Sequence, residues 1–270
     1  MLRFAANLSM MFTHLPFLDR FAAAADQGFD HVEYLFPYAF APEELARVLE
    51  KNGLSQALFN LFPGDWEAGE RGLACLPGRE KEFEASVEQA ILYAKALKCP
   101  MVHAMAGILP AGVTCEKGGA VYLGNIRRAA ERLDAEGLRL SLEPINQISM
   151  PGYFLRTQAQ AVDYIKELAL PNIRLQFDFF HRQMQEGNVA GGLRACFPFI
   201  GHCQIAGAPE RHEPNRGELH YPYLFSLLEE LGYSGVIGCE YNPAGDTTAG
   251  LAWIRPHGVT ARGRIPAFAS

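Results

Sequence analysis

The 270-residue sequence has a deficit of positive charge, with 24 Lys and Arg residues against 30 Asp and Glu residues and a formal net charge of -6. Binding along nucleic-acid phosphates requires a basic surface, so this balance argues against a nucleic-acid partner. No apolar run reaches the roughly 18 residues needed to span a bilayer, and the first residues lack a signal-peptide cleavage pattern. We therefore expect a cytoplasmic protein with no membrane segment.

Sequence motifs that would indicate other chemistries are also missing. None of the six cysteines forms a C-x-x-C pair, which argues against zinc ligation and disulfides and predicts buried free thiols. No G-x-G-x-x-G follows the first apolar run, so the dinucleotide-binding fingerprint is absent. The sequence contains no internal repeat and no low-complexity tract.

Short apolar runs alternate with helical patterns along most of the chain. We expect strands at 4–7, 31–36, 56–59, 101–105, 138–143, 173–178, 199–204 and 235–240. Helical patterns between them cover 15–27, 42–52, 80–97, 117–136, 158–168, 189–196 and 221–231. In the third of these, Phe83, Val87, Ile91 and Ala94 recur at helical spacing and predict a buried face.

Eight strands that alternate with helices predict an α/β fold, a single-domain (β/α)8 TIM barrel over residues 1–254. A doubly wound open sheet is the alternative, and the missing glycine fingerprint weakens it. Residues 255–270 have weak periodicity and several Pro, Gly and Arg residues. We expect them to form a C-terminal extension that lies over the surface or is partly disordered.

Four oxygen-bearing side chains each close an apolar run: Glu143, Asp178, Gln204 and Glu240, at intervals of 35, 26 and 36 residues. These intervals match a strand-plus-helix unit, and a (β/α)8 barrel builds its active site where the carboxyl ends of its strands meet. Three crowded carboxylates repel strongly unless a cation lies among them. An all-oxygen set predicts Mg²⁺ or Mn²⁺ rather than zinc or copper. For any single residue, the alternative of a strand cap or an Arg partner stays open.

Several segments together carry a family resemblance that runs from about residue 1 to residue 254. They are Asn7-Leu-Ser-Met-Met, Glu33-Tyr-Leu-Phe-Pro-Tyr, Gly69-Glu-Arg-Gly, Pro77-Gly-Arg-Glu, Glu143-Pro-Ile-Asn, Gln176-Phe-Asp-Phe-Phe-His181, Gly201-His-Cys-Gln-Ile-Ala and Gly238-Cys-Glu-Tyr. In these segments the chain resembles the hydroxypyruvate isomerase family, one of the xylose-isomerase-like barrels. Arg211-His-Glu-Pro and Tyr221-Pro-Tyr-Leu-Phe look closer to the related 2-oxo-tetronate isomerases, whereas Glu143-Pro-Ile-Asn with Pro151-Gly-Tyr looks more like the hydroxypyruvate branch.

The resemblance implies a metal-dependent isomerase whose partner is a small 2-oxo acid. The expected reaction converts hydroxypyruvate to 2-hydroxy-3-oxopropanoate (tartronate semialdehyde) through an enediolate. A 2-oxo-tetronate isomerase is the alternative, and a ketose 3-epimerase or sugar isomerase is a further one. Substrate length, the physiological metal and a homo-oligomeric state stay open at this point.

The resemblance also assigns roles to individual residues. Glu143 and Glu240 match the acid/base pair and, with Asp178 and Gln204, the metal ligands, whereas many relatives have His at the position of Gln204. His181 and Arg211 match substrate-binding positions. Arg71 is a further candidate for a substrate carboxylate, against the simpler interpretation of a loop salt bridge with Glu70.

Overall fold

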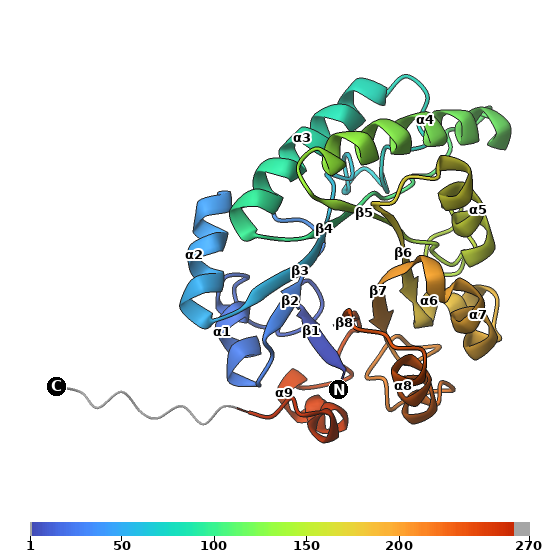
Figure 1. The fold of residues 1–270 in the computed structure, drawn as a ribbon. Coiled ribbons are helices and arrows are strands. Elements are labelled where there is room, and N and C mark those ends of the chain that lie inside the picture. The colour runs from blue at the N-terminus through green and yellow to red at the C-terminus, as the bar shows by residue number, and fades with distance from the viewer. Residues whose placement is uncertain (1, 262–270) are drawn as a thin grey trace.

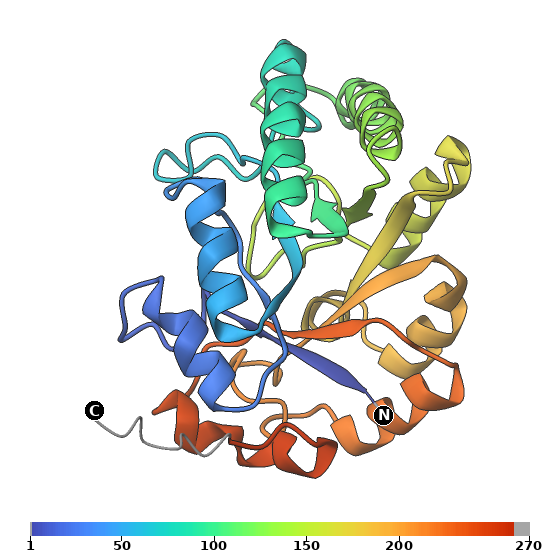
Figure 2. The same ribbon diagram turned by 60° about the vertical axis from the view of Figure 1, so that its left-hand side comes forward.

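The computed structural model of the chain describes residues 2–261, in which eight parallel strands form a closed barrel (Figure 1). The strands are β1 (Arg3–Asn7), β2 (His31–Glu33), β3 (Ser55–Asn60), β4 (Met101–His103), β5 (Arg139–Leu142), β6 (Ile173–Asp178), β7 (Ile200–Ile205) and β8 (Val236–Cys239). Strand β1 pairs in parallel with both β2 and β8, and Figure 2 shows this closure of the barrel. The predicted (β/α)8 barrel is therefore confirmed, and the open doubly wound sheet is excluded.

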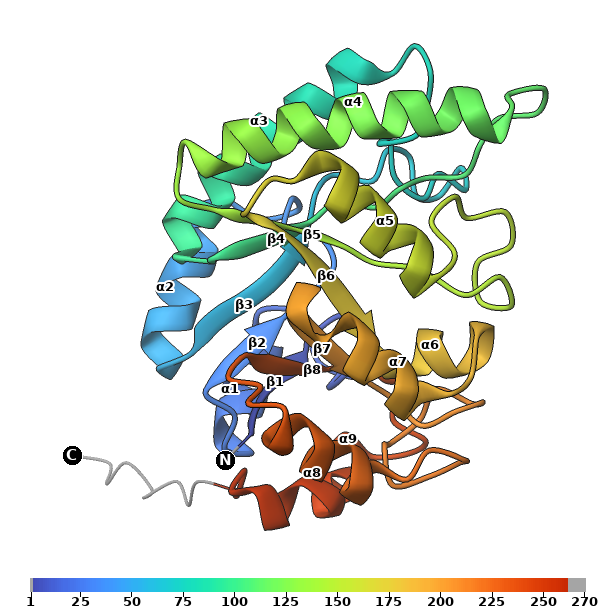
Figure 3. The ribbon, with the colours of Figure 1, turned by 45° about the vertical axis from the view of Figure 1, so that its right-hand side comes forward.

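Helices surround the barrel on its outer side. They are α1 (Asp19–Asp26), α2 (Pro42–Asn52), α3 (Glu80–Leu97), α4 (Cys115–Asp134), α5 (Gln158–Leu168), α6 (Phe179–Gln185), α7 (Val189–Cys196), α8 (Tyr221–Glu230) and α9 (Thr247–Gly250). Two 3-10 segments cover Phe197–Phe199 and Leu251–His257. Helices α3 and α4 lie side by side against β4 and β5 (Figure 3). The predicted face of α3 is confirmed, because Phe83, Val87, Ile91 and Ala94 are all buried.

The bounds of α1, α4 and α8 differ from their predictions, and α6 and α9 were not predicted. Helix α1 begins at Asp19 rather than at residue 15. Pro16 disfavours helical backbone at Leu15, and residues 16–19 form a turn in which the Asp19 N–H donates to the Pro16 carbonyl. Helix α6 was not predicted and follows β6 without a loop. Asp178 starts it by accepting hydrogen bonds from the backbone N–H groups of Phe180 and His181, which is the usual role of Asp at a helix N-terminus.

All six cysteines are free thiols, as expected, and five of them are buried. The prediction of burial is wrong for Cys115, which is exposed. Cys115 is the first residue of α4, where the first turn faces solvent. Within residues 2–261, no helix combines the length and the apolar character that crossing a bilayer requires.

The interior of the barrel is polar. Alternate residues of a barrel strand point inward, and in most such barrels they are bulky branched apolar side chains. Here the inward positions hold buried polar residues that hydrogen-bond across the barrel, namely Asn7, Glu33, Gln176, His202 and Gln204. The apolar core lies instead between the strands and the surrounding helices. Residues 262–270 of the predicted C-terminal extension lie outside the described residues.

Candidate active site

Three carboxylates meet at the carboxyl ends of the strands. Glu143 directly follows β5, Asp178 is the last residue of β6, and Glu240 directly follows β8. Together with His181 they form a buried group in which one possible ligand atom from each residue lies within 4.8 Å of the others. The sequence had placed these three carboxylates together, and the barrel brings them to one mouth. Such a group could hold a metal ion.

Two carboxylate oxygens of this group are buried without a hydrogen-bond partner. Asp178 uses Oδ1 to accept from the backbone N–H groups of Phe180 at 2.7 Å and His181 at 3.2 Å. Its Oδ2 is buried without a hydrogen-bond partner, and so is Oε1 of Glu143. Buried polar atoms are almost always paired, so these two oxygens are suited to bind a cation.

The pKa values of the three carboxyl groups also favour a cation at this position. Burial, followed by the neighbouring Glu240 and Asp178, raises the pKa of Glu143 well above its usual value. Burial also raises the pKa of Glu240 to about 8 and that of Asp178 to about 6, although the Arg211 guanidinium opposes both shifts. A divalent cation among the three groups would lower these pKa values, because it favours the ionised carboxylates.

Arg211 already supplies one positive charge to the group. Its Nη2 lies 2.5 Å from Oε2 of Glu240 and 3.6 Å from Oδ2 of Asp178. Its guanidinium also stacks over the Phe180 ring, with 5.0 Å between Cζ and the ring centroid. The backbone of Arg211 is left-handed, with a φ of 58°. Strained backbone of this kind is held by its surroundings and clusters at functional sites.

His181 presents a proton to the site. The Oδ1 of Asn146 accepts from the backbone N–H groups of Ile148 at 3.0 Å and Ser149 at 2.8 Å. The Nδ2 of Asn146 must therefore be the atom that lies 2.6 Å from Nδ1 of His181, and it can only donate. Burial, and next Arg211, lower the pKa of His181, so its ring is neutral. A neutral ring whose Nδ1 accepts carries its proton on Nε2, which lies 3.7 Å from Oδ2 of Asp178.

This tautomer separates two roles for His181. An Nε2 that carries a proton cannot bind a metal through that nitrogen, whereas it can donate to an oxygen of a ligand. The geometry thus favours the predicted substrate-binding position over membership in a metal ligand set.

Gln204 follows the register of Asp178 on the neighbouring strand, and its side chain is held by one amide and one carboxylate. Its Oε1 accepts from Nε2 of Gln176 at 2.6 Å, and its Nε2 donates to Oε1 of Glu33 at 2.9 Å. Glu33 also accepts from Nδ2 of Asn7 at 3.1 Å and lies 2.7 Å from Nε2 of His202. One lone pair of the Gln204 oxygen is thus used, and a second remains for a cation.

Arg71 lies in a different environment from the one predicted. Its guanidinium stacks on Trp66, with 4.0 Å between Cζ and the ring centroid. Its Nη1 donates to the backbone carbonyls of Trp66 at 2.9 Å and Glu70 at 2.7 Å. The carboxylate of Glu70 pairs with Arg79 instead. Among the contacts of the described residues, none joins Arg71 to the three carboxylates.

Sequence reasoning missed Glu33 and Asn7 as parts of the site. Glu33 is 1% exposed, and Asn7 connects it to Oε1 of Glu240, which lies 3.4 Å from Nδ2 of Asn7. Their positions could have indicated this role. Asn7 and Glu33 are each the last residue of a strand, and each side chain points into the barrel.

Comparison with known proteins gives one consistent result. The model of the xylose isomerase-like TIM barrel family matches residues 21–257. A 2-oxo-tetronate isomerase of Cupriavidus necator is 52% identical over 255 residues, covering 94% of this chain and 98% of the relative. The hydroxypyruvate isomerase of Escherichia coli is 45% identical over 257 residues, covering 95% of this chain and 100% of the relative.

A solved structure extends this likeness to three dimensions. The crystal structure of an AP endonuclease, family 2, from Brucella melitensis superposes with a TM-score of 0.93 at 48% identity, covering 95% of this chain and 99% of that one. The resemblance carried by the sequence motifs is thereby confirmed. The chain belongs to the xylose isomerase-like TIM barrel family.

Proposed function

We propose that this enzyme is a divalent-metal-dependent isomerase that acts on a small 2-oxo acid in the cytoplasm, with hydroxypyruvate as its substrate. The observation that carries the proposal is the buried group of Glu143, Asp178, Glu240 and His181 at the carboxyl ends of the strands. The relatives that align over nearly the whole chain carry isomerase names, in agreement with the activity expected from the motifs.

The metal would be held by oxygen donors. Glu143, Asp178 and Glu240 would supply carboxylate oxygens, and Gln204 would supply its amide oxygen. This all-oxygen set suits Mg²⁺ or Mn²⁺. When bound, such a cation supplies positive charge that stabilises the negative oxygens of an enediolate.

The reaction needs a base and an acid on neighbouring carbons. Hydroxypyruvate and 2-hydroxy-3-oxopropanoate differ by one proton moved from C3 to C2 and one hydroxyl proton moved from the C3 oxygen to the C2 oxygen. One of Glu143 and Glu240 takes the proton from C3 as a carboxylate and leaves an enediolate. The other, as a carboxylic acid, gives a proton to C2, while the proton of the C3 hydroxyl passes to the C2 oxygen, so that C3 becomes the aldehyde. The two residues enter from β5 and β8, so they can approach a bound substrate from different sides.

Two further residues would position the substrate. His181 donates from Nε2 to a substrate oxygen, and Asn146 keeps the proton on that nitrogen. Arg211 offers a planar fork of donors that suits a carboxylate or a pair of oxygens. We keep Arg71 as a candidate for the substrate carboxylate, although its stacking on Trp66 gives it a structural role as well.

The second candidate substrate is 2-oxo-tetronate, and one observation favours it. The 2-oxo-tetronate isomerase of C. necator is 52% identical to this chain, whereas the hydroxypyruvate isomerase of E. coli is 45% identical. Both substrates carry the same 2-oxo acid group and would use the same acid/base pair.

The test compares both substrates in one assay. Chelator-treated protein should be inactive and should regain turnover with Mg²⁺ or Mn²⁺. The reconstituted enzyme is then given hydroxypyruvate, 2-oxo-tetronate and a neutral ketose. Glu143→Gln and Glu240→Gln should each lower turnover by at least about 100-fold, the usual range for a positioned proton-transfer group. Full activity of metal-free protein, or near wild-type turnover of either variant, would overturn the proposal.

A further inference from the structure

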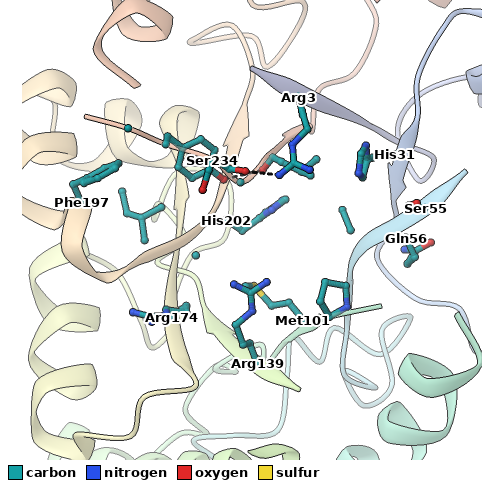
Figure 4. Close-up of a pocket in the computed structure, with 18 of the residues that line it drawn as sticks. Arg3, His31, Ser55, Gln56, Met101, Arg139, Arg174, Phe197, His202 and Ser234 are labelled. Carbon is teal, nitrogen blue, oxygen red and sulfur yellow. Dashed lines mark hydrogen bonds between the residues drawn. The ribbon is translucent and has the colours of Figure 1, made fainter. Parts of the chain in front are cut away.

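The opposite mouth of the barrel holds a second hollow, with a volume of about 720 Å³. It lies at the amino ends of the strands, because its lining includes the first residues of seven strands. These are Arg3, His31, Ser55, Met101, Arg139, Ile200 and Val236. Arg174, the second residue of β6, completes the ring. Figure 4 shows Arg3 and Arg139 reaching into the hollow from opposite sides.

The strand register explains why these cations face inward. Alternate residues of a barrel strand share one face. Arg139 is therefore on the same face of its strand as Ser141 and Glu143, and Arg174 is on the same face as Gln176 and Asp178. Ser141 donates to Gln176 on the neighbouring strand at 2.9 Å, and Gln176 donates to Gln204, which in turn donates to Glu33 across the barrel, so both series point inward. The same alternation that directs carboxylates to one mouth directs guanidinium groups to the other.

Two of the arginines in this hollow have no carboxylate partner among the described residues. Among the described residues that line it, there are three Arg, one Lys and two His, and no Asp or Glu. Within residues 2–261, Arg139 and Arg174 form no ion pair, and Arg3 donates to the backbone carbonyl of Ser234. The chain as a whole is acidic, with a net charge of -6. A concave cluster of cations in an acidic protein therefore needs another explanation than general surface charge.

The inward-facing carboxylate of Glu33 forms no ion pair with Arg139 or Arg174. Glu33 lies two residues beyond His31, and it is occupied by Asn7, Gln204 and His202. His202 lines the hollow and stands between it and Glu33. The guanidinium donors of Arg139 and Arg174 therefore remain available for a ligand.

We propose that the hollow at the amino ends of the strands binds a small dianion through Arg3, Arg139 and Arg174. The ligand would carry a phosphate group or two carboxylates, because a guanidinium binds either of these in a bidentate manner. The concave shape and the volume of about 720 Å³ suit a metabolite rather than a polymer. This site is separate from the carboxylate centre and does not depend on the reaction proposed there.

Calorimetric titration of the metal-loaded protein tests the site. The probes are inorganic phosphate and succinate, with acetate as the monovalent comparison, at constant ionic strength and at a pH where phosphate is a dianion. Wild-type protein should bind phosphate or succinate with a Kd of about 1 mM or tighter. Binding of both dianions indicates recognition by charge, and binding of phosphate alone indicates a phosphate ligand.

Four single variants locate the binding. Arg139→Gln and Arg174→Gln should each weaken the dianion by at least about tenfold, the expected effect of losing a charge-assisted hydrogen bond. Arg127→Gln removes one positive charge from the exposed face of α4 and should leave the Kd unchanged. Arg211→Gln removes the cation of the carboxylate centre and should also leave it unchanged. Circular dichroism melting confirms that each variant is folded.

Several results would overturn the proposal. The proposal fails if the wild-type protein binds neither dianion. It also fails if the Kd is unchanged in both Arg139→Gln and Arg174→Gln. Equal weakening by Arg127→Gln would mean a response to total charge. Loss of binding only in Arg211→Gln would place the anion in the carboxylate centre.

Discussion

Replacing Glu33 tests the polar interior on which the candidate site rests. Its carboxylate is 1% exposed and accepts from Nδ2 of Asn7 and Nε2 of Gln204, and it lies 2.7 Å from Nε2 of His202. Strand β8 leaves room for it at Gly238, where a Cβ atom would lie 2.2 Å from Oε1 of Glu33. Glu33 thus connects three strands by hydrogen bonds that cross the barrel.

Two variants of similar size separate the charge from the hydrogen bonds. In Glu33→Met, the donors of Asn7, Gln204 and His202 lose their acceptor in a buried place. Each buried unsatisfied donor costs about 1–3 kcal/mol. We expect the free energy of unfolding to fall by about 3–5 kcal/mol, because some donors will find water. In Glu33→Gln, the amide oxygen still accepts from Asn7 and Gln204, and its NH₂ can donate to His202 after a change of tautomer. We expect a loss of roughly 1–2 kcal/mol.

Urea unfolding followed by circular dichroism measures both losses, with unchanged m-values as a check on the comparison. Glu131→Met on the exposed side of α4 is the matched control and should stay within about 0.5 kcal/mol of the wild type. A loss below about 1 kcal/mol for Glu33→Met, or equal losses for both Glu33 variants, would refute the reasoning that charge-assisted bonds organise this interior.

Four further predictions concern the carboxylate centre. Asp178→Asn keeps the oxygen that starts α6 and should weaken Mg²⁺ or Mn²⁺ binding by roughly tenfold or more in a metal titration; an unchanged affinity would remove Asp178 from the ligand set. Burial raises the pKa of Asp178 to about 6 and that of Glu240 to about 8, so the metal-free folded protein holds more protons than the unfolded chain above the ordinary carboxyl pKa. Its stability should therefore fall as the pH rises from about 4 to about 8, Mn²⁺ should abolish the fall, and a rise of urea-unfolding stability over this window would contradict the assignment. Asn146→Ala removes the side-chain donor 2.6 Å from Nδ1 of His181 and leaves only the longer contact of 3.4 Å from the backbone N–H of residue 146. It should shift the ring ¹⁵N resonances of His181 toward the other tautomer, whereas unchanged shifts would mean that the Asn146 side chain does not set the tautomer. Arg211→Lys should lower kcat/KM on the 2-oxo acid about 10- to 150-fold, the equivalent of about 1.5–3 kcal/mol, because lysine lacks the planar fork; an equal loss on a neutral ketose would mean that Arg211 only orders its loop.

The sequence by itself determined the barrel and the positions of the three carboxylates. Strand and helix periodicities are local, since they depend on residues two or four positions apart. A polar residue that closes an apolar run must lie at a strand end. The parallel order then brings the ends of β5, β6 and β8 to one mouth. For the same reason, the cations that open β1 and β5 could have been assigned to the other mouth from sequence.

Only the tertiary structure decided which side chains contact each other. Glu33 and His202 are 169 positions apart, and their contact depends on closure of the barrel and on the rotamers chosen inside it. The proton on Nε2 of His181 depends on two backbone N–H groups that fix the Asn146 amide. Arg71 stacks on Trp66 because the loop between β3 and α3 folds back on itself. Sequence spacing sets which face a side chain takes, whereas its partner depends on distances that exist only after the barrel has closed.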